Sequence, residues 1–431
     1  YALEALEDII GIDALIVSYQ NSDISQKLSA DAIFGTQQIV GELPVNVSPS
    51  FREGDGIEIK YINNFGFAFP SELGFDPKKM EKIDNLSKVA IDSLMTPGIR
   101  VLVSRKGKIV YDKNFGYHTY EKKRHVLKSD IYDLASLTKI LATLPLVIKS
   151  FSNGEINFDT TVSDLLPDWK NTNKSDISLK KMLSHQAYLF PWIPFYEKTL
   201  NSKGYPKKSI YQSKFSKKYS LPVVSNLYLK TDFEKEMYKQ IKESTLLEKE
   251  MSKYSDLPYY ILKLYFEKKY RDKFENIVYK NIFNPLGLNN LRYQPLKYFE
   301  KENIVPSEVD NYFRKTKLQG YVHDMGAAMQ SGVGGHAGLF GNAYDVAAIM
   351  LMYLQDGNYN GLKLLNSEVI DAFNKSYFTS KGNRRGVGFD KPQLCGNHKS
   401  TCGCVSKKSF GHSGYTGTYA WADPDKEIII V

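Results

Sequence analysis

Cysteine is scarce in this chain of 431 residues, and its distribution is uneven. All three cysteines, Cys395, Cys402 and Cys404, fall in one short segment, with His398 between them. Their spacing lacks the two Cys-x-x-Cys pairs that are typical of structural zinc sites. We therefore expect no metal there, and either a loop disulfide with one spare thiol or three reduced thiols.

Long apolar runs are also absent. No stretch of about 18 apolar residues occurs, so the sequence predicts no transmembrane helix. The first residues, Tyr1 to Glu4, lack the anatomy of a signal peptide, and Ile428 to Val431 stop inside an expected strand. The sequence therefore looks like a fragment, and the missing export signal carries no information about the compartment.

The net charge of +9 comes from 57 basic and 48 acidic residues, and the lysines are scattered. No basic stripe is interleaved with aromatic residues, which disfavours a nucleic-acid-binding protein. Lysines on solvent-exposed surfaces explain the net positive charge. A mild attraction to an anionic polymer of the cell envelope is the alternative. The length and a hydrophobic content of 42% predict a folded protein with room for two or three domains.

The first chemical motif is Ser136-x-x-Lys139, which opens an apolar helical run beginning at Ile140. Residues three apart share one face of a helix, so the Lys139 ammonium is expected to reach the Ser136 hydroxyl. Burial of this turn would lower the pKa of Lys139 and let it take the serine proton. The same spacing recurs at Ser178 and Lys181, but there Ser178 is better explained as the N-cap of a short helix.

The expected elements begin with a strand at 14–17, buried on both faces, and a helix over 23–34 that ends at Gly35. An aromatic segment punctuated by glycine and proline, residues 59–72, is interpreted as a linker. A helix then follows Asp76, with an apolar face formed by Met80, Ile83, Leu86, Ala90 and Leu94.

A hairpin over 100–111 precedes the Ser136 helix, because Arg105-Lys106-Gly107 separates two apolar runs. A long section, about 165–375, is expected to be helical. Strands return at 412–422 and 427–431. One sheet split by a helical insertion explains this order, so the fold class is α/β.

Two further motifs follow Ser136 in order. Tyr254-Ser255-Asp256 lies at a loop-to-helix boundary, and His412-Ser413-Gly414 opens a strand. Penicillin-binding proteins and β-lactamases carry Ser-x-x-Lys, a polar triad in the helical domain and Lys-Thr-Gly on a sheet strand. Residues 73–431 therefore resemble the class C β-lactamase-like serine hydrolases, a superfamily that also includes D,D-peptidases, esterases and peptidoglycan amidases.

Other phrases carry the same resemblance. Leu183-Ser184-His185-Gln186 is similar to the family's segment that follows the catalytic helix. Residues 334–340 are similar to the Gly-rich stretch that leads back to the sheet. Together with 320–324, the latter indicates the branch of penicillin-binding proteins and N-acetylmuramoyl-L-alanine amidases. The implied fold is β-lactamase/transpeptidase-like, an antiparallel sheet flanked by helices plus a helical domain, which in that family continues past this C-terminus.

The N-terminal part resembles a different family. Phe34-Gly35 and Gly41-Glu42-Leu43-Pro44-Val45 look like the end of the α/β sandwich domain of family 3 glycoside hydrolases. The resemblance covers residues 1–58 and implies a sandwich remnant without the barrel that carries that family's nucleophile. It further implies that the full-length protein is fused to an exo-β-N-acetylglucosaminidase.

The resemblance assigns roles to individual residues. Ser136 would be the acyl-accepting nucleophile, Lys139 its proton acceptor, and Tyr254, as phenol or phenolate, the proton shuttle to the leaving amine. His412 replaces the usual lysine, so the positive charge at this position would depend on pH. If the imidazolium holds a substrate carboxylate, kcat/KM would fall as the pH rises through the histidine pKa near 6.5. The oxyanion hole would be formed by the backbone N–H groups of Ser136 and Tyr415. The expected substrate-binding residues are Asp256 (in place of asparagine), Ser413, Gly414, His323 and Asp324.

The resemblance implies a serine amidase that cleaves muramoyl-peptides between the lactyl group and L-alanine, with at most slow β-lactam hydrolysis. The alternatives are a D,D-carboxypeptidase, a β-lactamase or a carboxylesterase at the same site, and a non-catalytic module that binds cell-wall peptides. No cofactor or metal is expected, and His185 and His336 are expected to stabilise turns. The implied location is the bacterial periplasm, the cell envelope or the medium.

Overall fold

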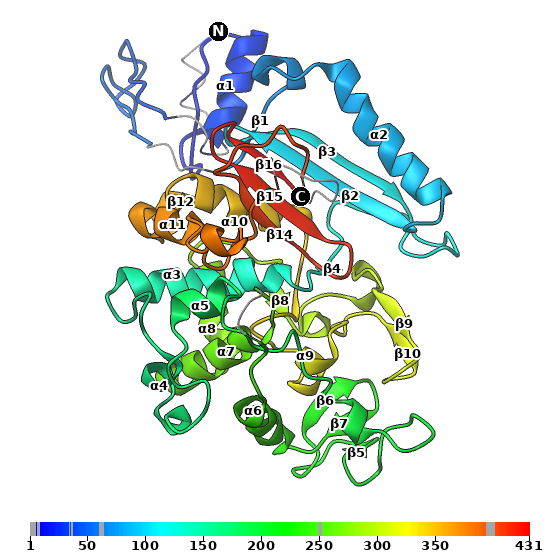
Figure 1. The fold of residues 1–431 in the computed structure, drawn as a ribbon. Helices are drawn as coiled ribbons and strands as arrows, with labels where there is room; N and C mark the ends of the chain where they lie inside the picture. The colour runs from blue at the N-terminus through cyan, green and yellow to red at the C-terminus, as the bar shows by residue number, and fades with distance from the viewer. Residues whose placement is uncertain are drawn as a thin grey trace.

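The computed structural model describes residues 6, 9–33, 35, 38–59, 64–248, 252–393 and 401–431. A six-stranded sheet lies at one end of the main body, with the strand order β1-β3-β2-β16-β15-β14 (Figure 1). Its strands are β1 Gly66–Phe67, β2 Gly98–Arg105, β3 Lys108–Gly116, β14 Phe410–Ser413, β15 Tyr419–Asp423 and β16 Ile428–Ile430. All neighbours are antiparallel except β1, which pairs in parallel with β3. The predicted sheet, built from both ends of the domain, is confirmed.

The hairpin β2–β3 forms where the sequence predicts it. Its turn residues Lys106 and Gly107 have φ values of 51° and 70°. Two consecutive positive φ angles are typical of the type I′ turn, whose twist matches that of the flanking strands.

The C-terminal strands return to this hairpin. The single strand expected over 412–422 is instead two strands, β14 and β15, because the chain turns at 414–418. There Gly414 N donates to Thr418 O at 2.6 Å. β16 then inserts beside β2, with Ile429 opposite Ser104.

Helices cover both faces of the sheet. On one face lies α2 (Pro77–Asp92), begun by Asp76, whose side chain accepts from Lys78 N. Its partly buried Met80 and Ile83 pack near Val103. The predicted apolar face was too long, since Leu86 and Leu94 are mostly exposed and α2 ends before the latter. The other face contacts α10 (Ala343–Leu354), which is buried along most of its length.

The insertion between β3 and β14 is less purely helical than predicted, because four small sheets interrupt it. Its other α-helices are α3 Leu144–Ser152, α4 Val162–Leu165, α5 Leu179–Leu183, α6 Phe233–Glu243, α7 Leu257–Tyr270, α8 Phe274–Val278, α9 Met325–Met329 and α11 Ser367–Asn374. The small sheets comprise β4 Tyr132–Asp133 with β11 Leu339–Gly341 and β8 Arg292–Tyr293, β5 Tyr211–Gln212 with β7 Leu227–Leu229 and β6 Leu221–Val224, β9 Glu308–Asp310 with β10 Thr316–Leu318, and β12 Asn358–Tyr359 with β13 Leu362–Lys363.

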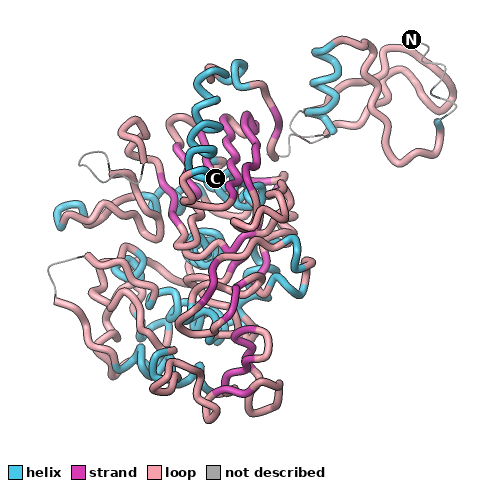
Figure 2. Tube along the Cα trace, turned by 90° about the vertical axis from the view of Figure 1, so that its right-hand side faces the viewer, coloured by secondary structure: helices cyan, strands magenta, loops and turns pink. Residues whose placement is uncertain are grey.

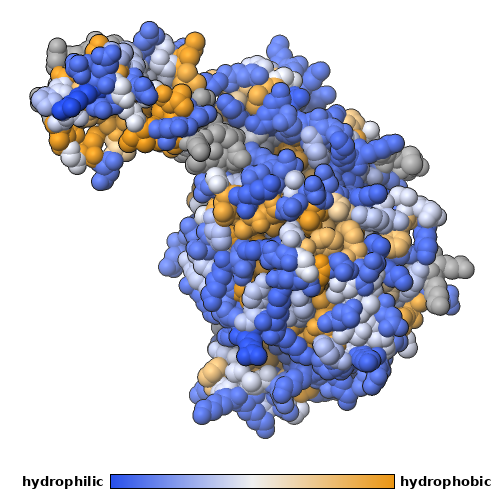
Figure 3. All heavy atoms as spheres, turned by 90° about the vertical axis from the view of Figure 1, so that its left-hand side faces the viewer, coloured by the Kyte–Doolittle hydropathy of each residue, from blue (hydrophilic) through white to orange (hydrophobic). Residues whose placement is uncertain are grey.

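The N-terminal segment lies beside the main body (Figure 2). The predicted helix is confirmed as α1 (Asp23–Ile33), followed by Gly35 at a φ of 70°. The predicted strand at 14–17 is wrong: this stretch has no strand, and Leu15 and Ile16 are 40% and 42% exposed. A strand buried on both faces needs neighbouring strands, and none pairs with it in the described chain. Figure 3 shows apolar side chains on the surface of this segment.

The predicted linker over 59–72 is partly ordered by the sheet, since β1 falls inside it. Residues 60–63, and Phe34 of the glycosidase-like phrase, lie outside the described residues. In the described part of the chain, no helix has the length and apolar character needed to span a membrane.

Candidate active site

Ser136 lies at a sharp turn between β4 and the helix that precedes α3. Leu134 N donates to Leu339 O, and Asp133 Oδ1 accepts from Ala135 N at 2.9 Å. Ala135 has a φ of 44°, a conformation that is uncommon for a residue with a side chain. The turn therefore directs the chain from a paired strand straight into the helix that begins just after Ser136.

The helix after Ser136 starts with a wide turn. Residues Lys139–Thr143 form a π-helical stretch, and only then does the regular helix α3 begin. Ile140 and Leu141 are fully buried in the main core. Such wide turns are frequent at functional sites, and here the core fixes the turn that carries Lys139.

The structure brings the first two motifs together on the Ser136 hydroxyl. Lys139 Nζ donates to Ser136 Oγ at 2.9 Å, and the Tyr254 hydroxyl donates to the same oxygen at 3.0 Å. A serine oxygen contacted by an amine and a phenol has two groups within reach that accept or return a proton.

Lys139 is completely buried, and its ammonium contacts several groups. Its Nζ lies 2.7 Å from Asp256 Oδ1 and donates to His336 O at 3.1 Å. Burial alone would lower the pKa of Lys139, but the charge and hydrogen-bond interactions with Asp256 and Tyr254 outweigh it and raise that pKa. The predicted lowering was therefore wrong. The cause is Asp256 of the second motif, which was predicted to bind substrate and instead pairs with Lys139.

Tyr254 is positioned by the loop over 185–191. Its ring packs against the His185 ring at a centroid distance of 4.5 Å, and Asp256 N donates to Pro191 O at 2.8 Å. Burial raises the pKa of Tyr254, against the opposing effect of the Lys139 charge. The tyrosine is therefore a phenol at neutral pH, which corrects the phenolate alternative. His185 Nδ1 accepts from Ser255 N at 3.1 Å, in line with the expected role of His185 in stabilising a turn.

His412 lies on β14, beside the same group of residues. Its ring is 5.8 Å from the Tyr254 ring, and its side chain is buried. Burial, together with the nearby Lys139 charge, lowers the pKa of His412 to about 4. Because the imidazole is neutral at neutral pH, Nδ1 carries its proton toward Ser413 O, 2.7 Å away. The expected imidazolium and its pH limb near 6.5 were therefore wrong, because the burial of this side chain depends on the fold and not on the local motif.

We expect the imidazole resonances of His412 to titrate near pH 4, and to stay constant between pH 6 and 8. The measurement is a pH series of histidine NMR spectra, in which the His412 signals are assigned by their loss in His412→Gln. A midpoint above pH 6 would show that the ring is charged near neutrality, and would restore the imidazolium as a carboxylate ligand.

The turn after β14 is attached directly to the segment before Ser136. Thr416 Oγ1 donates to Asp133 O at 2.7 Å, and Thr418 Oγ1 donates to Leu134 O at 3.1 Å. A Cβ on Gly414 would lie 2.7 Å from Leu134 O, so glycine permits this close approach. The backbone N–H groups of Ser136 and Tyr415, the expected oxyanion hole, donate to no acceptor among the described residues.

Comparisons with known proteins agree with this geometry. The family model described as Beta-lactamase matches residues 88–431. The chain belongs to the beta-lactamase family.

Curated relatives in this family include proteins from Salmonella agona (strain SL483) and Salmonella typhi. Both are named "Putative D-alanyl-D-alanine carboxypeptidase" and are 29% identical to this chain over 393 residues, covering 84% of each chain.

Solved structures show the beta-lactamase-family fold. EstCE1, titled a hydrolase with promiscuous acyltransferase activity, matches with a TM-score of 0.57 at 18% identity, covering 82% of this chain and 92% of that one. A penicillin-binding protein homologue from Pyrococcus abyssi matches with a TM-score of 0.58 at 19% identity, covering 81% and 72%. A class C beta lactamase matches with a TM-score of 0.56 at 15% identity, covering 83% of this chain and 93% of that one. The predicted β-lactamase/transpeptidase-like fold is confirmed.

The remaining predicted substrate residues of this beta-lactamase-family chain differ in their surroundings. Ser413 is exposed on β14. His323 Nε2 lies 3.0 Å from Glu308, and its ring is 5.0 Å from the Tyr415 ring, which is 85% exposed. Asp324 instead caps α9 and accepts from His336 Nε2 at 2.8 Å. Since the His336 carbonyl accepts from Lys139, Asp324 acts on the site through His336.

Two residues near the site were missed in the sequence. Asp133 is buried and holds the turn before Ser136 through Ala135 N and His323 N, and burial raises its pKa to about 6. Arg385 places its guanidinium carbon 5.6 Å from the Tyr254 ring. Neither lies in one of the three motifs, so only proximity in the fold identifies them.

The alternatives set aside in the sequence are also resolved. Ser178 caps α5 by accepting from Lys181 N, as predicted, and is not part of the Ser136 cluster. Cys402 and Cys404 are joined by a disulfide, whereas Cys395 and His398 lie outside the described residues. Within the described residues, no group of three histidine, cysteine or carboxylate side chains is placed to hold a metal ion.

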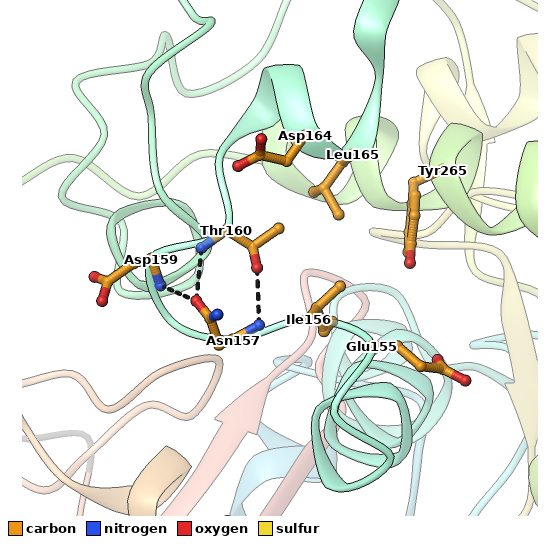
Figure 4. A pocket seen from close by; sticks show the side chains of 8 residues that line it. All are labelled: Glu155, Ile156, Asn157, Asp159, Thr160, Asp164, Leu165 and Tyr265. Atoms are coloured by element: carbon orange, nitrogen blue, oxygen red, sulfur yellow. Dashed lines mark hydrogen bonds between the residues drawn. The ribbon is translucent and has the colours of Figure 1, made fainter.

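A surface pocket of about 390 Å³ lies away from these residues, between the loop after α3 and the helix α7 (Figure 4). Its rim includes Glu155, Asp159 and Asp164. Asn157 Oδ1 accepts from Asp159 N and Thr160 N, and the Glu155 carboxylate pairs with Lys269. The polar groups of this pocket therefore serve the local turn, and none of the three motifs contributes to it.

Proposed function

We propose that this beta-lactamase-family protein is a serine peptidase that forms an acyl-enzyme on Ser136 with peptides ending in D-Ala-D-Ala and releases the last D-alanine. The observation that carries the acyl-transfer chemistry is the Ser136 hydroxyl, held within 3.0 Å of both Lys139 Nζ and the Tyr254 hydroxyl. The names of the curated relatives, putative D-alanyl-D-alanine carboxypeptidases, support this substrate over the muramoyl amide predicted from the sequence.

The proposed reaction has two steps. The reactive form is the one in which Lys139 or Tyr254 has lost a proton to solvent. Ser136 Oγ then attacks the carbonyl of the scissile amide, its proton passes to the Lys139 amine or the Tyr254 phenolate, and the N–H groups of Ser136 and Tyr415 donate to the oxyanion. The same proton is delivered to the leaving amine as the C–N bond breaks. Water then attacks the ester, and the acyl group leaves as a carboxylic acid, which restores the serine.

Cleavage of N-acetylmuramoyl-peptides between lactyl group and L-alanine is the second candidate. Exposed aromatic rings near the site favour it, because such rings offer flat apolar faces to a sugar. Tyr415 is 85% exposed, and Trp192, which follows the Pro191 carbonyl bound by Asp256 N, is 47% exposed. A link to a family 3 glycosidase through residues 1–58, with a linker over 59–72, remains a proposal from the sequence phrases, to which the comparisons add no support. A location in the cell envelope follows from either substrate.

The test compares three substrates on one protein sample. We expect diacetyl-L-Lys-D-Ala-D-Ala to release D-alanine faster than N-acetylmuramoyl-L-alanyl-D-isoglutamine releases its peptide, with slow nitrocefin turnover at most, measured by mass spectrometry and absorbance. The same assays with Ser136→Ala report any contaminating hydrolase. Faster release from the muramoyl-peptide would promote the amidase, and rapid nitrocefin turnover would promote the β-lactamase.

A further inference from the structure

Basic residues are concentrated in one stretch of the insertion between β3 and β14. Residues 198–218 contain seven lysines and no acidic residue. Seven of the 57 basic residues therefore lie here, and the other 50 nearly balance the 48 acidic ones. Most of the net charge of +9 comes from this stretch. We call its lysines the lysine patch: Lys198, Lys203, Lys207, Lys208, Lys214, Lys217 and Lys218.

The fold collects the lysine patch around β5, at one end of the molecule. Residues 198–208 precede this strand, and residues 213–219 form the turn after it. The two parts are joined by the Tyr219 hydroxyl, which donates to Ser209 O at 3.3 Å. Figure 1 shows β5, with its neighbours β6 and β7, at the end of the main body opposite the six-stranded sheet. The lysines on both sides of β5 therefore belong to one surface.

The lysine patch is exposed and lacks acidic partners. All its side chains are exposed except that of Lys207, which is half-buried and donates to Lys198 O at 2.8 Å. Among the residues that the structure describes, no carboxylate forms an ion pair with any of the seven lysines. The acidic residues nearest in sequence, Glu197 and Asp232, lie outside the stretch. The positive charge is therefore available to an anionic partner.

Two exposed aromatic side chains lie among these lysines. Phe215, which lies between Lys214 and Lys217 in sequence, is 66% exposed, and Tyr205 is 56% exposed. The Phe215 ring packs edge-on against the Tyr228 ring of β7 at a centroid distance of 6.1 Å, which holds it at the surface. Lysines around exposed aromatic rings suit an anionic bilayer, where ammonium groups contact lipid phosphates and rings enter the interface. A water-soluble polyanion attracts the lysines but offers no apolar layer to Phe215.

We propose that the lysine patch, together with Phe215 and Tyr205, binds the surface of a bilayer that contains anionic phospholipids. The ammonium groups contact the lipid phosphates, and the Phe215 ring moves from water to the boundary between headgroups and acyl chains. The lysines supply most of the affinity, so binding weakens as salt screens their charge. This inference does not depend on the proposed peptidase function, because none of the three motifs contributes to the patch.

The test measures co-sedimentation of the purified protein with phosphatidylglycerol vesicles and with neutral phosphatidylcholine vesicles. We expect binding to the former, weakening as salt is added, and none to the latter. Replacing Lys214, Lys217 and Lys218 together with glutamine should lower the affinity about tenfold or more. Phe215→Ser should lower it about threefold or more, without changing binding to inorganic polyphosphate. The fluorescence of Phe215→Trp, compared with wild type, should shift to the blue on phosphatidylglycerol vesicles and not with polyphosphate.

The matched control replaces Lys78, Lys79 and Lys82 with glutamine. It removes the same charge from exposed positions on α2, which packs on the six-stranded sheet. It should leave vesicle binding unchanged, and thermal unfolding of every variant reports the fold. No binding to phosphatidylglycerol vesicles, or an equal loss in the two triple variants, would overturn the inference. Unchanged vesicle binding by Phe215→Ser, or no blue shift in Phe215→Trp, would also overturn it and would indicate a soluble polyanion as the partner.

Discussion

Replacing Ser136 with alanine is expected to abolish peptide turnover and covalent labelling by a serine-directed phosphonate. The hydroxyl lost is the one contacted by both Lys139 and Tyr254, and the proposed ester forms on this oxygen. Removing a nucleophile of this kind lowers kcat on the order of 10⁴-fold or more. Labelling is measured by mass spectrometry of the intact protein, and turnover by release of D-alanine.

Ser178→Ala is the control for this experiment. Ser178 has the same sequence spacing to a lysine but caps α5, so its loss should cost about 1 kcal/mol of stability and leave labelling unchanged. Labelling that persists in Ser136→Ala, or disappears in Ser178→Ala, would place the nucleophile elsewhere. Circular dichroism distinguishes loss of the nucleophile from loss of the fold.

Replacing Asp256 with asparagine is expected to move the rise of kcat/KM with pH to a lower pH. The rise reports deprotonation of the group that takes the Ser136 proton, which is Lys139 or Tyr254. The Asp256 carboxylate raises the pKa of both, so either assignment gives the same direction. A charge 2.7 Å from the ammonium shifts a pKa by about one to three units, so activity at pH 7 should increase about tenfold or more.

The measurement is a pH profile of kcat/KM for the peptide. A second pH profile, of the rate of labelling by the phosphonate, isolates the attack by Ser136, because labelling involves no leaving amine. Asp256→Glu retains the charge and should keep the rise close to its wild-type position. A rise that stays in place in Asp256→Asn would show that it reports a group other than Lys139 or Tyr254. That result, or a move to higher pH, would contradict the prediction.

The three motifs predicted the fold because their order reflects the topology. A serine at the start of a buried helix, a tyrosine before α7 and a histidine opening β14 meet only if a sheet is split by an insertion. Strong local signals also held, such as the two-residue turn at Lys106 and Gly107 and the cap at Asp76.

What the sequence could not provide was the environment of each charge. Whether Asp256 faces substrate or Lys139 depends on side-chain direction at one loop-to-helix boundary. Whether His412 is charged depends on how much of β14 is covered. The strand expected at 14–17 failed for a related reason, since an apolar run indicates burial but does not show which other strands are present to bury it.

The position of β16 has a consequence for how the protein is made. This strand lies between β2 and β15, and its Ile429 pairs with Ser104. A ribosome therefore completes the Ser136 helix long before it supplies β14, the Tyr415 turn and β16. Until then β2 presents an open edge, which is a site for pairing with other chains. Pairing so distant in sequence also slows folding. The nascent protein is thus inactive and prone to aggregation until β14 to β16 are in place, when the edge of β2 is covered and the catalytic groups first meet.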